Sequence, residues 1–178
     1  MSHAEHGEAL VIRRAGVEAA EALGRIHALA WQAAYRGIAT EEFLQDFTPQ
    51  RRTAFFQRIL PDTKNEHYLL EWQGEPVGML ALGPQEDAAV EGRRCGEVIA
   101  LYLLPEHVGQ GIGRRTLHFA LDRLRALGFA DAVLTVLSEN TRALRLYRSF
   151  GFVPDGEEEP FWMGRPVMER RYRCRLVK

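Results

Sequence analysis

The sequence predicts a single α/β domain in which strands and helices follow one another along the chain. Two strand-like segments, 67–72 and 76–82, flank the turn residues Gln73-Gly74-Glu75 and predict a β-hairpin. The apolar run that begins at Val98 leads through three closely spaced glycines into a helical pattern. A length of 178 residues, with 46% hydrophobic and 26% charged residues, suits one domain with its own core.

The charge and polarity of the chain limit the classes of partner that we expect for it. The net charge is −1, so neither nucleic acid nor a membrane is expected as a partner. No apolar run approaches the ~20 residues of a membrane span. Residues 1–9 lack the apolar core of an export signal, so we expect a flexible leader before a single domain over 10–178 in a cytoplasmic protein. Cys95 and Cys174 are then expected as reduced thiols, and no Cys/His spacing predicts a metal site.

The first part of the chain predicts one strand and three helices. Residues 10–14 form a short strand pattern. Residues 16–35 place apolar side chains on one helical face, and Gly37 ends that helix. Thr40 and Thr48 are N-cap residues for two further helices, the second of which begins with proline.

The remaining segments predict two helices separated by a strand, and two closing strands. The acidic segment 155–159 is expected to be a solvated loop, and the alternative is that its residues 157–159 attract a cationic acceptor. The other expected elements are a loop over 84–96, a strand from Val98, a helix over 114–128, a strand over 132–137, a helix capped by Asn140 and running to about Phe150, a strand from Phe152 and a strand over 167–177.

The turn from Gly109 to Gly113 predicts either a tight strand-to-helix connection or a nest for a phosphate group. Glycines let backbone N–H groups approach a ligand because no Cβ stands in the way. The following helix points its free N–H groups and the positive end of its dipole at the same place. The chain lacks the Lys-Ser/Thr ending of a Walker loop, and Arg114 stands where a dinucleotide fingerprint has its third glycine. A phosphate nest would therefore be of another kind.

Tyr147 lies seven residues after Asn140 and therefore on the same face of the short helix. It is either a buried phenol with a hydrogen-bond partner or a proton donor directed at a leaving group. A phenol has a pKa near 10 and is protonated at neutral pH. The opposite side of the helix carries Arg142, Arg145 and Arg148. These arginines are either a row exposed to solvent or a group that attracts a phosphate to the mouth of the site.

The segment 98–113, together with Asn140-Thr-Arg-Ala143-Leu-Arg-Leu-Tyr147-Arg-Ser-Phe-Gly151-Phe152, resembles the GCN5-related N-acetyltransferase (GNAT) superfamily. The segment from Trp31 to Ile38 and the order of elements from Leu10 to Val177 are also similar to that family. The resemblance implies a GNAT-like α/β (α+β) fold, with a mixed, mostly antiparallel central sheet of six to seven strands flanked by about four helices. It also implies acetyl-CoA as cosubstrate, an amine acceptor and a homodimer.

The same resemblance implies which residues bind the cofactor. The main chain from Val108 to Arg114 would hold the diphosphate of CoA, although the family often has Gln or Arg at the position of Val108. Exposed strand backbone would pair with the pantetheine arm. Tyr147 corresponds to the general acid that protonates the CoA thiolate. The implied cofactor-binding residues are Leu101, Tyr102, Leu103, Val108, Gly109, Gln110, Gly111, Ile112, Gly113, Arg114, Asn140, Ala143 and Tyr147.

Glu97 and three aromatic residues are candidates for the acceptor side of the reaction. Glu97 is the candidate general base, directly or through a water, with an ordinary strand-end interaction as the alternative. Trp31, Tyr35 and Trp72 are candidate walls of a pocket for a cationic or flat amine. The alternative for Trp31 and Tyr35 is a place in the core.

These residues lead to the hypothesis of an acetyl-CoA-dependent N-acetyltransferase that acts on a primary amine of a small molecule or peptide. Neither Cys95 nor Cys174 lies in the expected site segments, which favours direct attack by the amine over an acyl-enzyme. Two alternatives are a non-catalytic CoA-binding sensor or interaction domain and an acyltransferase that uses a longer acyl-CoA.

Overall fold

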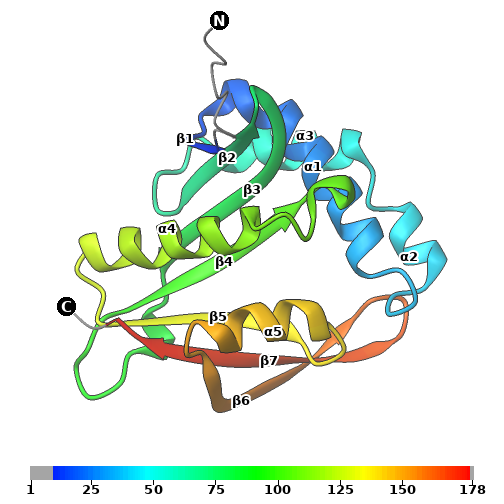
Figure 1. Cartoon of the computed structure of the whole chain (residues 1–178). Coiled ribbons are helices and arrows are strands. Elements are labelled where there is room, and N and C mark those ends of the chain that lie inside the picture. The colour runs from blue at the N-terminus through cyan, green and yellow to red at the C-terminus, as the bar shows by residue number, and fades with distance from the viewer. Residues whose placement is uncertain (1–9, 177–178) are drawn as a thin grey trace, which may run out of the picture.

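The computed structural model describes residues 10–176 and contains one seven-stranded sheet with helices on both faces (Figure 1). The sheet order is β1-β2-β3-β4-β5-β7-β6, and every neighbouring pair is antiparallel except β4 and β5. The strands are β1 (Leu10–Arg14), β2 (Glu66–Trp72), β3 (Glu75–Pro84), β4 (Cys95–Leu103), β5 (Asp131–Leu137), β6 (Val153–Trp162) and β7 (Pro166–Arg175), and the α-helices are α1 (Ala20–Ala34), α2 (Glu41–Gln45), α3 (Pro49–Ile59), α4 (Ile112–Ala126) and α5 (Thr141–Ser149).

The mixed, mostly antiparallel sheet expected from the sequence is confirmed, and five α-helices flank it within the described residues where about four were expected. The three expected helix caps are also confirmed. The side chains of Thr40, Thr48 and Asn140 each accept a hydrogen bond from a backbone N–H in the first turn. The expected leader over 1–9 lies outside the described residues. Among residues 10–176, no helix has the length and apolar content needed to cross a bilayer.

The acidic segment 155–159 corrects one expectation, because it lies within β6 and is not a loop. The register between β6 and β7 shifts between Pro154 and Glu158, so the acidic run occupies an irregular stretch of the strand. Arg170 Nε lies 2.6 Å from Glu158 Oε1 across the two strands. Cross-strand pairs of opposite charge stabilise a sheet, so the arginines of β7 make an acidic strand possible.

Two apolar clusters fix the helices to the two faces of the sheet. On one face, Leu117 and Leu124 of α4 and Leu144 of α5 pack against the strands. On the other face, Leu23 of α1 and Phe56 of α3 belong to a second buried cluster. The apolar stripe of α4 is the one that its sequence predicts. Helices therefore cover both faces of the sheet.

Strands β4 and β5 pair only near their beginnings and then diverge (Figure 1). The parallel pairing runs from Cys95 with Asp131 to Glu97 with Val133 and stops there. On the other side of β4, the register with β3 shifts so that Ile99 is an extra residue. A bulge of this kind bends the strand that carries it. The backbone of β4 beyond Glu97 therefore borders an opening in the sheet.

The segment between α1 and α2 contacts the turn between β6 and β7 (Figure 1). The backbone N–H of Thr40 donates to the Met163 carbonyl at 3.0 Å. Gly164 has φ of +75°, and a Cβ at this position would lie 1.8 Å from Thr40 Oγ1. Tyr35 and Met163 belong to the buried cluster beneath this contact. The hairpin and the helical segment therefore form one wall at the far end of β5.

Candidate functional site

A cavity of about 710 Å³ opens where β4 and β5 diverge. This volume is in the range of small-molecule and cofactor sites. Most of the residues that the sequence singles out line this one cavity although they come from four separate parts of the chain. They are Trp31, Tyr35, Leu101, Tyr102, Leu103, Val108, Gly109, Gly111, Gly113, Arg114, Asn140, Ala143 and Tyr147.

The glycine turn presents free backbone donors at one end of the cavity. Gly109 and Gly111 have φ of +86° and +83°, a conformation that glycine adopts without strain. The first N–H groups of α4, which starts at Ile112, have no acceptor within the helix. A Cβ at Gly111 would meet no atom within 4 Å, so the space beside the turn is open. The N–H of Val108 already donates to Pro105, at 3.3 Å. The turn from Gly109 onward therefore has the form of an anion-binding nest.

Two arginines add positive charge beside this turn. Arg114 and Arg142 both line the cavity. An Nη2 atom of Arg142 lies 3.2 Å from the place that a Cβ of Gly109 would occupy. Arg148, in contrast, donates to the hydroxyl of Tyr172 at 3.4 Å and does not line the cavity. Of these arginines of α5, Arg142 therefore lies at the cavity and Arg148 does not.

Helix α5 directs Tyr147 into the cavity from the side opposite β4. Asn140 Oδ1 accepts from the N–H of Ala143 at 3.2 Å and fixes the start of the helix. The Tyr147 ring packs edge-on to Phe152 with centroids 6.1 Å apart. Burial raises the pKa of the Tyr147 phenol above its ordinary value, and the nearby Tyr102 adds to the shift. The phenol is therefore neutral and able to donate a proton at any pH near neutrality.

Three tyrosines meet near the middle of the cavity. The hydroxyl groups of Tyr35 and Tyr102 lie 3.2 Å apart. Burial raises the pKa of Tyr35, and Tyr102, Tyr147 and Glu169 each raise it further. Burial also raises the pKa of Tyr102. This part of the cavity is therefore lined by uncharged phenols and disfavours additional negative charge.

Glu97 lies at the fork between β4 and β5 but outside the residues that line the cavity. Its Oε2 accepts a hydrogen bond from Gln85 Nε2 at 3.0 Å. Burial raises the pKa of the Glu97 carboxyl, while Gln85 and the more distant Arg171 act in the opposite direction. A raised pKa suits a carboxylate that exchanges protons near neutral pH. Contact with a reacting amine would have to pass through a water.

Three other residues singled out by the sequence also lie outside the cavity lining. Trp72 packs in the core at the end of β2, with the Arg115 guanidinium 5.7 Å from its ring, so it is not a wall of this cavity. The side chain of Ile112 is fully buried in the core. Gln110 donates its side-chain amide to the Glu106 carbonyl at 2.9 Å. At Ile112 only the main chain remains for a ligand.

Several cavity residues were not predicted from the sequence. Most of them lie on β5, on the end of β6 and the turn after it, and on β7, so their place in the cavity depends on the sheet order, whereas Ile99 is the extra residue of β4. Alternation along β7 indicates that Glu169 shares a face with Val167, but no sequence pattern indicates that this face meets α1. The residues concerned are Ile99, Thr135, Leu137, Phe161, Met163 and Glu169. Within residues 10–176, no cluster of three or more His, Cys, Asp or Glu side chains is arranged to hold a metal ion.

Residues 31–152 match the family described as Acetyltransferase (GNAT) family. A protein of Archaeoglobus fulgidus named as an uncharacterised N-acetyltransferase is 33% identical over 122 residues, which is 65% of this chain and 76% of that protein. The chain spans less than half the length of several other curated relatives.

Two solved structures share the fold over most of the chain. The PaiA N-acetyltransferase from Thermoplasma acidophilum in complex with coenzyme A has a TM-score of 0.71 and 19% identity, over 94% of this chain and 99% of that chain. The acetyltransferase yncA from Salmonella typhimurium, with its cofactor acetyl-CoA, has a TM-score of 0.69 and 22% identity, over 96% and 95% of the two chains. At these identities the likeness shows the fold.

Proposed function

The chain belongs to the acetyltransferase (GNAT) family and is an acyltransferase, and from this premise we propose that it transfers the acetyl group of acetyl-CoA to a primary amine of a small molecule or peptide. One observation carries the proposal. The glycine turn and the Tyr147 phenol line the same cavity, at the opening between β4 and β5. An anion nest and a neutral proton donor in one cavity match the two ends of a thioester-bearing CoA arm.

In this proposal the main chain holds the cofactor. The backbone N–H groups from Gly109 to Arg114 bind the diphosphate, with Arg142 as an additional positive charge. The pantetheine arm lies along Leu101 to Leu103, where β4 has no strand partner on the side of the opening. Amides of the arm would pair with this backbone like an added strand. The thioester then lies near Tyr147.

The proposed reaction proceeds by direct attack. The acceptor arrives as an ammonium ion, loses one proton, and its nitrogen attacks the thioester carbon. When the tetrahedral intermediate collapses, the C–S bond breaks and the thiolate receives a proton from Tyr147. The second proton of the nitrogen returns Tyr147 to its neutral form. One proton is released to solvent overall. Glu97 is the proposed acceptor of the first proton, through a water, since its raised pKa favours proton uptake.

The cysteines support direct attack rather than a covalent relay. Neither Cys95 nor Cys174 lines the cavity. Both thiols are free, and burial raises the pKa of each. A thiol with a raised pKa is a poor nucleophile because the thiolate is the reactive form.

Calorimetric titration with acetyl-CoA and a thiol-release assay with an amine panel test the proposal together. We expect saturable cofactor binding and amine-dependent release of CoA. Cofactor binding without release across the panel would favour the sensor alternative, and preference for propionyl- or succinyl-CoA would favour the longer acyl donor. Absence of binding at millimolar acetyl-CoA would reject the proposed function.

A further inference from the structure

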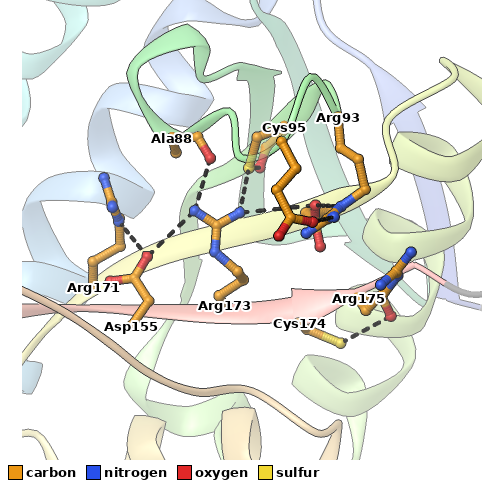
Figure 2. Close-up of polar contacts among 11 residues, drawn as sticks. Ala88, Arg93, Cys95, Asp155, Arg171, Arg173, Cys174 and Arg175 are labelled. Atoms are coloured by element: carbon orange, nitrogen blue, oxygen red, sulfur yellow. Dashed lines mark hydrogen bonds and ion pairs between the residues drawn. The ribbon is translucent and has the colours of Figure 1, made fainter.

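Three arginines of β7 are paired with carboxylates of β6. Arg170 pairs with Glu158 across the hairpin, with 2.6 Å between Nε and Oε1. Figure 2 shows Arg171 and Arg173 both directed at Asp155, at 2.7 Å and 3.4 Å. Arg173 also donates to the Ala88 carbonyl at 2.7 Å and lies beside Asp131. These arginines are held by other acceptors, so none of them is directed at the remaining carboxylate of the strand.

Glu169 is that remaining carboxylate. It lies between Leu137 of β5 and Glu159 of β6 in the sheet register and lines the cavity. Among the described residues, its half-buried side chain makes no hydrogen bond or ion pair. Burial raises the pKa of the Glu169 carboxyl, and Glu159 raises it further. A carboxylate that lines a cavity without a protein partner is available to bind a cationic group of a ligand.

Aromatic and apolar side chains line the cavity together with Glu169. Trp31 is stacked on Phe47 with centroids 4.2 Å apart and packs edge-on to Tyr35 at 4.8 Å. Phe161 and Met163 complete the wall of the cavity at the end of the β6–β7 hairpin. Aromatic faces beside one carboxylate favour a cation carried on an apolar or aromatic body.

No positive charge lies at this end of the cavity to receive a carboxylate of the acceptor. Among the described residues that line the cavity, Arg114 and Arg142 are the cations, and both lie at the glycine turn. Glu169 instead acts electrostatically on Tyr35 and Tyr102. An acceptor with its own carboxylate would bring like charge next to Glu169, which is strongly unfavourable in a partly desolvated site.

We propose that Glu169 is the specificity-determining residue of the acceptor end, binding the ammonium group of an amine with a flat apolar body and excluding amines that carry a carboxylate. The inference rests on the proposed function and names the substrate class of the same site. It assigns no proton transfer to Glu169, whose role is to hold and orient the ammonium ion before the reaction.

A matched set of acceptors tests the substrate class. 2-Phenylethylamine, phenylalaninamide and phenylalanine share an aromatic ring and an amine, and only the last carries a carboxylate. We expect the CoA-bound protein to bind 2-phenylethylamine at least about 100-fold more tightly than phenylalanine, with phenylalaninamide between them. Phenylalaninamide controls for the size of the added group. Equal or tighter binding of phenylalanine, or tighter binding of spermidine than of 2-phenylethylamine, would overturn the inference.

The variant Glu169→Gln tests the residue itself. It keeps the shape of the side chain and should raise Kd and KM for 2-phenylethylamine about 10- to 100-fold, with kcat changed less than about threefold. The Kd for CoA should stay unchanged, and Glu169→Asp should restore part of the affinity. Glu159→Gln is the control, because it removes the neighbouring exposed carboxylate and should leave amine binding within about twofold.

Direct binding separates this inference from the proposed function. Binding of 2-phenylethylamine that is lost in Glu169→Gln, without CoA release by the wild type, would reject acetyl transfer and retain the assignment of Glu169. Acetylation with the same KM in the wild type and in Glu169→Gln would retain acetyl transfer and overturn the assignment. Thermal unfolding of both variants shows whether a loss of binding is a loss of fold.

Discussion

The two ends of the cavity are built in different ways. The cofactor end is mainly main chain, from a glycine turn, a helix start and an unpaired strand edge that follow one another within 98–113. The acceptor end consists of side chains from α1, β4 and the β6–β7 hairpin, which meet only in the folded sheet. Main-chain groups are the same in any sequence that adopts the turn. Under the proposed function, local backbone geometry would therefore set the donor, whereas acceptor choice would depend on a few side chains such as Glu169.

Tyr147 lies between the two ends, and its loss should have the largest effect on activity. We expect Tyr147→Phe to lower kcat about 100-fold or more, because the departing thiolate loses its proton donor. The Kd for CoA should change less than about threefold. Steady-state kinetics and calorimetry measure the two quantities.

Tyr172→Phe is the matched control, since it removes a buried phenol outside the cavity. Because burial raises the pKa of Tyr147, wild-type kcat should show no decline from phenol ionisation up to about pH 10. An unchanged kcat in Tyr147→Phe, or an alkaline decline that disappears in it, would remove its assignment as a donor with a raised pKa.

Gly111→Ala should damage the cofactor end alone. A side chain at φ of +83° costs about 1–2 kcal/mol, and its Cβ would stand in the open space of the nest. We expect the Kd for CoA to rise about 10- to 100-fold, as measured by calorimetry. Gly92→Ala is the control, because Gly92 has φ of +73°, no atom within 4 Å of an added Cβ, and no place in the cavity. Equal loss of CoA binding in both variants would show that general strain, and not the nest, is responsible.

The helix caps and the glycine turn could be predicted from the sequence because the information that specifies them is local. The caps at Thr40, Thr48 and Asn140 and the glycine turn each depend on a few consecutive residues, and the structure confirms these elements. Spacing on one helix also placed Tyr147 on the face of Asn140. Local patterns of this kind can be interpreted without knowledge of the sheet order.

The acceptor end could not be predicted in the same way. Glu169 reaches the cavity because β7 inserts between β5 and β6, a pairing that no local pattern specifies. Trp72 was expected there only because it is aromatic, and it packs in the core instead. The acidic composition of 155–159 predicts a loop, whereas its pairing with Arg170 and Arg171 as a strand depends on the same hairpin.

Gly164→Ala should damage the acceptor end alone and so complement Gly111→Ala. An added Cβ would lie 1.8 Å from Thr40 Oγ1, so the β6–β7 turn must move away from the start of α2. We expect KM for the amine to rise about tenfold, while the Kd for CoA stays within about twofold. Gly74→Ala, in another hairpin turn with open space around it, controls for the effect of positive φ. Loss of CoA binding in Gly164→Ala would mean that the two ends are not independent.

The smallest effect concerns an ion cluster outside the cavity and should change stability alone. Arg123, Tyr68 and Arg14 hold the pKa of Glu66 at about 2, below its ordinary value of 4.5. A depressed carboxyl pKa stabilises the fold above pH 4.5, and this contribution is lost as the pH falls from 4.5 towards 2. Glu66→Gln should therefore lower the free energy of unfolding by about 1–2 kcal/mol at pH 7 and by much less near pH 2. Urea denaturation at the two pH values measures the difference, and a constant difference between them would contradict the proposed ion pairing. The Kd for CoA and KM for the amine should match the wild type, because Glu66 touches neither end of the cavity.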